Sequence, residues 1–254
     1  MKAEKLKVSS FTVYYGRGRI RELSNFDLAI LSPLLDSREV SALNSLGTIT
    51  ISYLNLTLLG GWEPWASKVR EAMFLPGKAV INPENPEWRK TILEAVGYIN
   101  RKGFQGFFID SMDMVDLYPE MAEPLVSLVA EIRRRNPGCP LIVNRGFSIL
   151  QKLTPHINGL VFDGFATYYN PSTLQYEKWR NSDLEWMLET CGRLRRLQET
   201  LGIKVLALAY ANPRDRRFPE YREYVSKLAR RFGFTYYIAE RDFLTVTPRR
   251  MLEA

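Results

Sequence analysis

Residues 103–113 read Gly-Phe-Gln-Gly-Phe-Phe-Ile-Asp-Ser-Met-Asp. The apolar run inside this stretch predicts a β-strand at 107–110 that is covered on both faces, as in a parallel sheet. Asp110 ends this strand, so its carboxylate would lie at the rim of a low-dielectric core, where burial and neighbouring charges tune the pKa. Asp113 follows three residues later, close enough to perturb the pKa of Asp110 or to orient its side chain. The alternative is that Asp110 only caps the helix that follows.

Similar apolar runs recur along the whole chain and alternate with amphipathic helical stretches. Asn85-Pro86, for example, starts a helix whose apolar stripe includes Trp88 and Ile92, and Gly103 ends it. About eight such repeats favour a (β/α)8 TIM-type barrel of the α/β class over an open sheet, and we expect a single domain over residues 1–254. The strand count depends most on the short connection between the fifth and sixth runs. The predicted strands are residues 10–15, 26–31, 48–55, 107–110, 141–144, 159–162, 205–210 and 235–239.

The composition and charge are those of a soluble globular enzyme. The chain is 46% hydrophobic and 25% charged, which argues against long disorder. A formal net charge of +7 would suit an anionic partner such as nucleic acid. However, the basic residues lie mainly on predicted helix faces and in last turns, as at 133–135, where they stay solvated and complement the helix dipole. The run Gly16-Arg-Gly-Arg could bind an anion but lacks the rest of a phosphate-binding pattern. We therefore expect no nucleic-acid partner.

The rare residue types argue against several other kinds of site. Cys139 and Cys191 are far apart, and His156 is the single histidine. An imidazole metal site or a Ser/His/Asp triad is therefore disfavoured, and we expect no metal and no cofactor. No apolar run approaches membrane-spanning length, and the start, Met-Lys-Ala-Glu-Lys-Leu-Lys, lacks a signal-peptide core. This predicts no membrane partner and a cytoplasmic location, with secretion as the alternative if a leader has been trimmed from the chain.

Polar side chains follow most of the predicted strands. In a barrel, the carboxyl ends of the strands meet at one face, which carries the active site. Asp163 follows the sixth predicted strand, two strands along from the strand that Asp110 ends. Because neighbouring strands lie about 4.8 Å apart, these two carboxyls can approach the roughly 5–9 Å that retaining and inverting glycosidases span. Glu63 and Glu240 are the alternative carboxylates.

Several of these segments resemble one family of glycosidases. Residues 47–55, Gly-Thr-Ile-Thr-Ile-Ser-Tyr-Leu-Asn, followed by Gly-Trp-Glu-Pro-Trp at 61–65, are similar to the third-strand region of the endo-α-1,4-polygalactosaminidase-like glycoside hydrolases (glycoside hydrolase family 114). Residues 103–113 resemble the Gly-Phe-Asp-Gly-Val-x-x-Asp-Asn-x-Asp motif of that family. Asn144 matches an asparagine at the end of the next strand, and Arg241-Asp-Phe-Leu resembles the closing Arg-Asp-Leu segment. The resemblance runs in order from residue 11 to residue 244.

This resemblance implies a TIM-like barrel that cleaves an amino-sugar or related polysaccharide without a metal, with Asp110 as one catalytic carboxylate. The chain departs from the family pattern at three positions: Asp163 replaces a glutamate, Ser111 an asparagine and Ala66 an arginine. A catalytically impaired carbohydrate-binding barrel is therefore the alternative to an active glycosidase. The net charge also favours a neutral, N-acetylated or anionic glycan over a polycation, unless the cleft is locally acidic.

The sequence thus predicts a carbohydrate substrate and a site with two kinds of residue. Asp110 and Asp163 are the predicted catalytic pair, and the sequence is compatible with either a retaining or an inverting reaction. For each aromatic residue among the predicted substrate-binding residues, packing in the hydrophobic core would explain its presence equally well. The predicted substrate-binding residues are Tyr15, Tyr53, Asn55, Glu63, Trp65, Asp113, Asn144, Tyr210 and Glu240.

Overall fold

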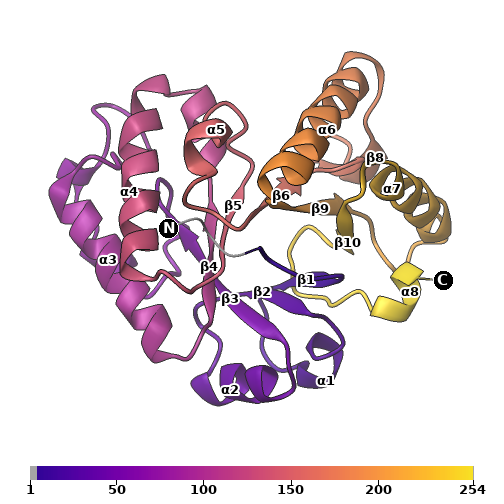
Figure 1. Ribbon diagram of the computed structural model, residues 1–254, viewed down its shortest axis with the longest axis horizontal. Coiled ribbons are helices and arrows are strands. Elements are labelled where there is room, and N and C mark those ends of the chain that lie inside the picture. Colours follow the sequence, from indigo (N-terminus) through magenta and orange to yellow (C-terminus); the bar gives the residue numbers. More distant parts are fainter. Residues whose placement is uncertain (1–4, 254) are drawn as a thin grey trace.

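The protein is a parallel barrel surrounded by helices (Figure 1). The structure is a computed structural model that describes residues 5–253. Residues 1–4, part of the stretch considered above for a leader, and residue 254, the end of the predicted domain, lie outside the described residues. The predicted (β/α)8 class is confirmed. The barrel strands are β1 (Phe11–Tyr14), β2 (Leu28–Leu31), β3 (Ile49–Asn55), β4 (Gly106–Asp110), β5 (Leu141–Asn144), β6 (Gly159–Asp163), β9 (Lys204–Tyr210) and β10 (Thr235–Ala239).

The eight strands are all parallel and follow one another in the order β1-β2-β3-β4-β5-β6-β9-β10. The ring is nearly closed, because β1 and β10 approach one another without a regular ladder among the described residues. Backbone and side-chain contacts join this part of the barrel instead, and two of them illustrate the packing. The backbone N–H of Tyr15 donates to the carbonyl of Phe243 at 2.8 Å, and the rings of Phe11 and Tyr237 pack with centroids 5.9 Å apart.

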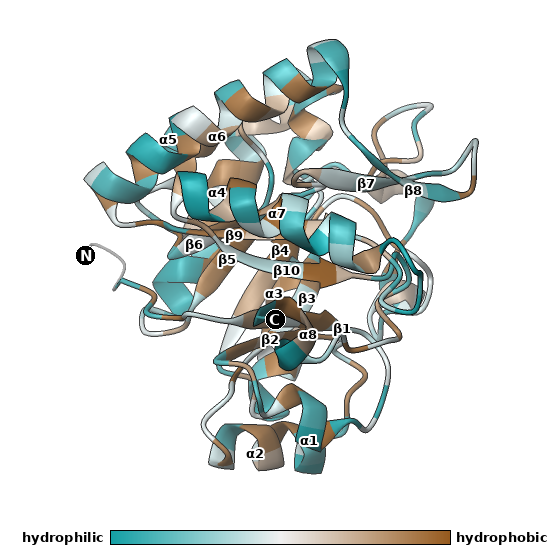
Figure 2. Cartoon of the chain, turned by 90° about the vertical axis from the view of Figure 1, so that its right-hand side faces the viewer, coloured by the Kyte–Doolittle hydropathy of each residue, from teal (hydrophilic) through white to brown (hydrophobic). Residues whose placement is uncertain are grey.

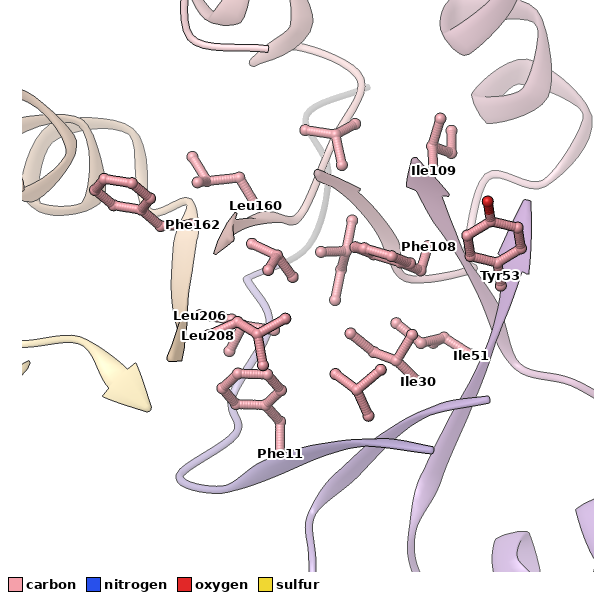
Figure 3. Packing of buried hydrophobic residues seen from close by; sticks show 14 of the residues in the cluster. Phe11, Ile30, Ile51, Tyr53, Phe108, Ile109, Leu160, Phe162, Leu206 and Leu208 are labelled. Carbon is pink, nitrogen blue, oxygen red and sulfur yellow. The ribbon is translucent and has the colours of Figure 1, made fainter. Parts of the chain in front are cut away.

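Apolar side chains from the strands fill the barrel interior (Figure 3). Phe11, Ile30, Ile51, Leu160 and Leu206 come from five different strands, and all are fully buried. Burying each such side chain is worth about 1.5–3 kcal/mol, which explains why these runs are apolar almost throughout. The packed interior leaves the carboxyl ends of the strands as the place where polar side chains can gather.

The helices cover the outside of the barrel with one apolar face each, and their polar faces point to solvent (Figure 2). In α3, the Asn85 side chain accepts from the backbone N–H groups of Glu87 and Trp88, at 2.9 and 3.1 Å. The helix start predicted at Asn85-Pro86 is therefore present. The α-helices are α1 (Ile20–Leu23), α2 (Ser37–Ser45), α3 (Pro86–Arg101), α4 (Ala122–Arg135), α5 (Leu150–Leu153), α6 (Asn181–Leu201), α7 (Phe218–Phe232) and α8 (Arg249–Glu253), and the 3-10 helices are η1 (Ala66–Lys68), η2 (Glu71–Met73), η3 (Met112–Asp116) and η4 (Pro119–Met121).

Two connections in the second half of the barrel differ from the regular alternation of one strand and one helix. Between β5 and β6 the only helix is the four-residue α5, yet the two strands still pair in parallel. After β6 the chain forms an antiparallel hairpin, β7 (Thr167–Asn170) and β8 (Gln175–Lys178), which the sequence analysis did not predict. The hairpin projects from the body of the barrel (Figure 2). Among residues 5–253, no helix has the length and apolar character needed to cross a bilayer.

Candidate active site

Four polar side chains meet at the carboxyl ends of four consecutive barrel strands. Asp110 ends β4, Asn144 ends β5, Asp163 ends β6 and Tyr210 ends β9. The strand register explains their proximity. Ile109 pairs with Val143, so Asp110 and Asn144 follow at the same level. Parallel pairing in a barrel therefore brings these residues together although the chain separates them by up to a hundred positions.

Asn144 bridges the two carboxylates. Its Nδ2 lies 2.7 Å from Oδ1 of Asp110 and 3.4 Å from Oδ2 of Asp163. Because both oxygens contact the same nitrogen, they can be no more than about 6 Å apart, whatever the angle between the contacts. Oδ1 of Asn144 is buried and has no hydrogen-bond partner among the described residues. A buried amide oxygen of this kind is an unused acceptor beside the carboxylates.

Asp163 lies in an environment that favours its protonated form. Burial raises the pKa of this carboxyl above its ordinary value, and the negative charge of Asp110 adds to the rise. Hydrogen bonds from Tyr210 and Asn144, and the positive charge of Arg145, act in the opposite direction without cancelling it. The Tyr210 hydroxyl donates to Oδ1 of Asp163 at 2.7 Å. Burial raises the pKa of Tyr210 well above its usual value, so this hydroxyl stays a donor.

Asp110 is held by donors from its own loop and from β3. The backbone N–H of Ser111 donates to Oδ1 of Asp110 at 2.7 Å. The Tyr53 hydroxyl also hydrogen-bonds to Asp110, while burial raises the pKa of Tyr53. Asn55 donates from Nδ2 to the Tyr53 hydroxyl at 3.1 Å and to Oγ of Ser111 at 2.8 Å. The Ser111 N–H and the Tyr53 hydroxyl thus orient the Asp110 carboxylate, and Asn55 holds both of these residues.

The backbone after β4 and β5 is strained directly beside these side chains. Ser111 has φ 61° and Arg145 has φ 56°, in the left-handed region that residues other than glycine seldom adopt. Ser111 is also the residue that precedes η3, whose start has no side-chain cap. Asp110 therefore does not cap the following helix. Strain of this kind persists where the surroundings hold it in place, and it is common at functional sites.

A cavity of about 410 Å³ opens at this end of the barrel. Asp110, Asn144 and Asp163 line it together with the two aromatic residues Tyr15 and Tyr53. The Tyr15 and Tyr53 rings pack edge to face with centroids 5.4 Å apart. Figure 3 shows Tyr53 beside Phe108 at the rim of the apolar core. The cavity thus combines two carboxylates with aromatic walls, as a sugar-binding site requires.

The remaining predicted site residues lie in different places. Asn55 is buried behind Tyr53 and Ser111. Asp113 forms an ion pair with Arg145 at 3.2 Å, and burial raises its pKa. Tyr210 reaches the site through Asp163. Like these three residues, Glu63, Trp65 and Glu240 do not line the cavity.

Glu63 and Trp65 are buried in the loop after β3. Glu63 is 4% exposed, and its Oε1 accepts from the backbone N–H of Gly60 at 2.9 Å. Trp65 is 3% exposed and packs edge to face against Tyr98. Neither side chain therefore reaches the cavity. The neighbouring Trp62, which is 40% exposed, lines it instead.

Sequence reasoning missed several residues of the cavity wall, namely Val13, Ser32, Leu34, Trp62, Phe108, Leu208 and Phe243. Ser32 follows β2 directly, so the strand-end rule that selected Asp110 could have found it. Trp62 stands one residue before Glu63, within the run already singled out. Phe243 lies within the Arg241-Asp-Phe-Leu segment already noted, but no local pattern placed it in the cavity, because a loop after β10 brings it against Tyr15, with ring centroids 5.1 Å apart.

A barrel with paired carboxylates and aromatic walls at the carboxyl ends of its strands is typical of glycoside hydrolases. The sequence model of glycoside-hydrolase family GH114 matches residues 11–250. The chain therefore belongs to family GH114 and is a glycosidase. The resemblance noted from the motifs is confirmed. A comparison with curated protein sequences found no match.

Solved structures of glycoside hydrolases share the fold. The glycoside hydrolase domain of PelA from Pseudomonas aeruginosa is 22% identical, with a TM-score of 0.79 over 94% of this chain and 98% of that chain. Aspergillus fumigatus Ega3, solved in complex with galactosamine, is 13% identical, with a TM-score of 0.74 over 97% of each chain. An α-galactosidase from Thermus thermophilus is 14% identical, with a TM-score of 0.58 over 96% of this chain and 61% of that chain.

Proposed function

We propose that this glycosidase hydrolyses an amino-sugar-containing or related polysaccharide without a metal ion, with Asp110 and Asp163 as its catalytic carboxyls. The observation that carries the proposal is that one amide, Asn144, contacts both carboxylates inside a single cavity. Hydrolysis of a glycosidic bond needs two carboxyl groups on opposite sides of that bond. The bound galactosamine in Ega3 supports an amino-sugar substrate.

The two carboxyls take different roles because their surroundings differ. Burial and the charge of Asp110 favour a proton on Asp163, so Asp163 is the proposed general acid. Its Oδ1 accepts the 2.7 Å hydrogen bond from Tyr210, whereas Oδ2 has only the longer 3.4 Å contact with Asn144, so Oδ2 is the proposed carrier of the proton. Oδ1 of Asp110 is held by Asn144 and Ser111, so Oδ2 of Asp110 is the proposed attacking atom.

The spacing of the carboxyls favours a retaining reaction. Retaining enzymes hold their carboxyl groups about 5–5.5 Å apart, whereas inverting enzymes leave about 6.5–9.5 Å for a water molecule. The Asn144 bridge limits the distance between Oδ1 of Asp110 and Oδ2 of Asp163 to about 6 Å, which is below the inverting range. In the first step, Asp110 bonds to the anomeric carbon as the glycosidic C–O bond breaks, and Asp163 gives its proton to the leaving oxygen. In the second step, Asp163 takes a proton from water, which attacks the same carbon and releases Asp110.

The proposed reaction needs no resident metal ion. Among residues 5–253, no group of three or more His, Cys, Asp or Glu side chains is placed to hold a metal ion. All steps above use only the two carboxyls and a water molecule. Activity should therefore survive dialysis against a chelator.

The test measures cleavage of a panel of amino-sugar oligosaccharides, with and without N-acetyl groups. We expect D110N and D163N to lose at least about a thousandfold in kcat. D183N is the matched control, since Asp183 is exposed in the first turn of α6 and lines neither this cavity nor the second one described below. Proton NMR of the first product formed should show retention at the anomeric carbon. Activity of D110N within a few-fold of the parent, or an inverted first product, would overturn the assignment.

A further inference from the structure

A second cavity, of about 330 Å³, adjoins the first at Asp163, which lines both. Asp110, the proposed nucleophile, lines only the first. In the proposed reaction, Asp110 contacts the sugar that stays on the enzyme, whereas Asp163 contacts the oxygen that departs. A cavity beside Asp163 and away from Asp110 therefore lies on the leaving-group side of the scissile bond.

The β7–β8 hairpin places an aromatic pair beside Asp163. Tyr168 and Trp179 both line the second cavity and are stacked, with ring centroids 4.0 Å apart and an interplanar angle of 15°. The Trp179 indole N–H donates at 2.6 Å to the carbonyl of Gly164, the residue that follows Asp163. A Cβ added to Gly164 would lie 3.6 Å from Cζ2 of Trp179, so the indole packs directly against this residue. The pair is therefore held one residue away from the proposed acid.

Trp186, on α6, is another aromatic surface of the second cavity. Its ring centroid lies 6.2 Å from that of Phe147 and 6.2 Å from that of Phe162. The side chain is nevertheless 42% exposed. One part of the ring is thus packed and another part is free to contact a ligand. A ring held in this way at a cavity can bind the apolar face of a ligand at a small entropy cost.

The two arginines that line the second cavity contact other protein groups. Nη1 of Arg145 lies 3.2 Å from Oδ2 of Asp113. The Arg241 guanidinium lies 4.3 Å from the centroid of Tyr169, and the backbone N–H of Arg241 donates to the Tyr176 hydroxyl at 3.1 Å. Arg241 thus fastens the loop after β10 to both strands of the hairpin. We therefore look to the aromatic rings of this cavity, rather than to its charges, for contacts with a sugar.

We propose that the second cavity binds the departing sugar, which stacks on Trp186 and on the Tyr168–Trp179 pair. The inference rests on the proposed function above and deepens it by assigning a leaving-group subsite. A pyranose ring has a face of C–H groups that packs against an aromatic ring, and both rings are rigid. This contact does not involve the substituent at C2 of the sugar, so it agrees with an amino-sugar substrate. The contact is lost when the leaving group has no ring.

The experiment compares a leaving group that has a sugar ring with one that has none. One substrate is α-1,4-linked tetragalactosamine, with its products measured by chromatography. The other is α-1,4-linked trigalactosaminyl fluoride, with the released fluoride measured by an electrode. In W186L we expect kcat/KM for the tetrasaccharide to fall about tenfold, because a stacking contact is lost. Fluoride release should change by less than about twofold, which also shows that W186L is folded.

Two further variants decide whether the aromatic ring is responsible. W186F keeps a ring at this position and should retain kcat/KM for the tetrasaccharide within about threefold. L201A is the control, since Leu201 is an apolar residue at the end of α6 that is 37% exposed and lines neither cavity. Its two rates should match those of the parent. An equal loss for both substrates in W186L, or no loss for the tetrasaccharide, would overturn the subsite.

The outcome separates this inference from the proposed function. If the parent protein cleaves the tetrasaccharide through Asp110 but W186L shows no selective loss, only the subsite is wrong. If the parent cleaves neither substrate, the catalytic proposal is wrong, and calorimetry with tetragalactosamine then decides the subsite. Binding that is about tenfold weaker in W186L than in the parent would support the subsite. Equal affinities, or no binding to the parent, would overturn it.

Discussion

The Tyr210 hydroxyl donates a 2.7 Å hydrogen bond to Oδ1 of Asp163. The two residues end strands β6 and β9, which are neighbours in the barrel although a hairpin and a long helix separate them in the chain. This bond stabilises the charged carboxylate, whereas burial and the charge of Asp110 favour the neutral acid. The protonation of Asp163 is therefore set by a balance that single substitutions can shift in either direction.

Removing the Tyr210 hydroxyl should raise the pKa of Asp163 further. In Y210F the charged form loses a donor, so the proton is held to a higher pH. We expect the alkaline limb of the kcat profile to move upward by about one pH unit. Y224F is the control, because Tyr224 lies on α7 and lines neither cavity. A downward shift of the alkaline limb would contradict the role given to Tyr210.

Neutralising Asp110 should have the opposite effect on Asp163. The negative charge of Asp110 contributes to the raised pKa of Asp163, so D110N should lower that pKa. Carbon-13 NMR of the labelled Asp163 carboxyl measures this directly and does not depend on activity. The D183N variant should leave the titration unchanged. An unaltered Asp163 titration in D110N would show that the two carboxyls are not coupled.

Lengthening Asp163 tests whether the shorter acid suits this site. Asp163 already contacts Tyr210 and Asn144, and an added methylene in D163E would displace the carboxyl from both. A displacement of about 1 Å can cost a hundredfold in rate, so we expect kcat to fall by about that factor. If D163E instead gains activity that the parent lacks, the carbohydrate-binding barrel with an impaired site is the better interpretation.

A buried arginine at the opposite end of the barrel should matter for stability rather than for catalysis. The Arg133 guanidinium is buried and donates to the carbonyls of His156, Asn136, Pro137 and Cys139. R133M would remove the guanidinium donor from all four carbonyls, and among the described residues only that of Asn136 has a second donor, the backbone N–H of Cys139. We expect the free energy of unfolding to fall by about 3 kcal/mol.

Denaturant titration of R133M measures this loss, with R134M as the control. Arg134 is next in the chain, but its side chain is 74% exposed. We expect R134M to change the free energy of unfolding by less than about 0.5 kcal/mol. Equal stability of the two variants would show that the carbonyl contacts of Arg133 contribute little.

The sequence by itself determined the barrel and the strand ends that carry Asp110, Asn144 and Asp163. Apolar runs with helical stretches between them leave few arrangements open, because a parallel strand must be covered on both faces. The register of such strands then places their last residues on one face. The β7–β8 hairpin escaped prediction, because its strands are short, polar and only partly buried.

The tertiary structure decided which residues share the cavity. Trp62 lines it and Trp65 does not, although both belong to one short run. Glu63 is buried behind the loop, and Phe243 arrives from the other end of the chain to contact Tyr15. The path of a loop and the direction of each side chain depend on packing between segments far apart in the sequence. Local residue patterns therefore located the two carboxylates, and only the folded chain showed that Asn144 joins them.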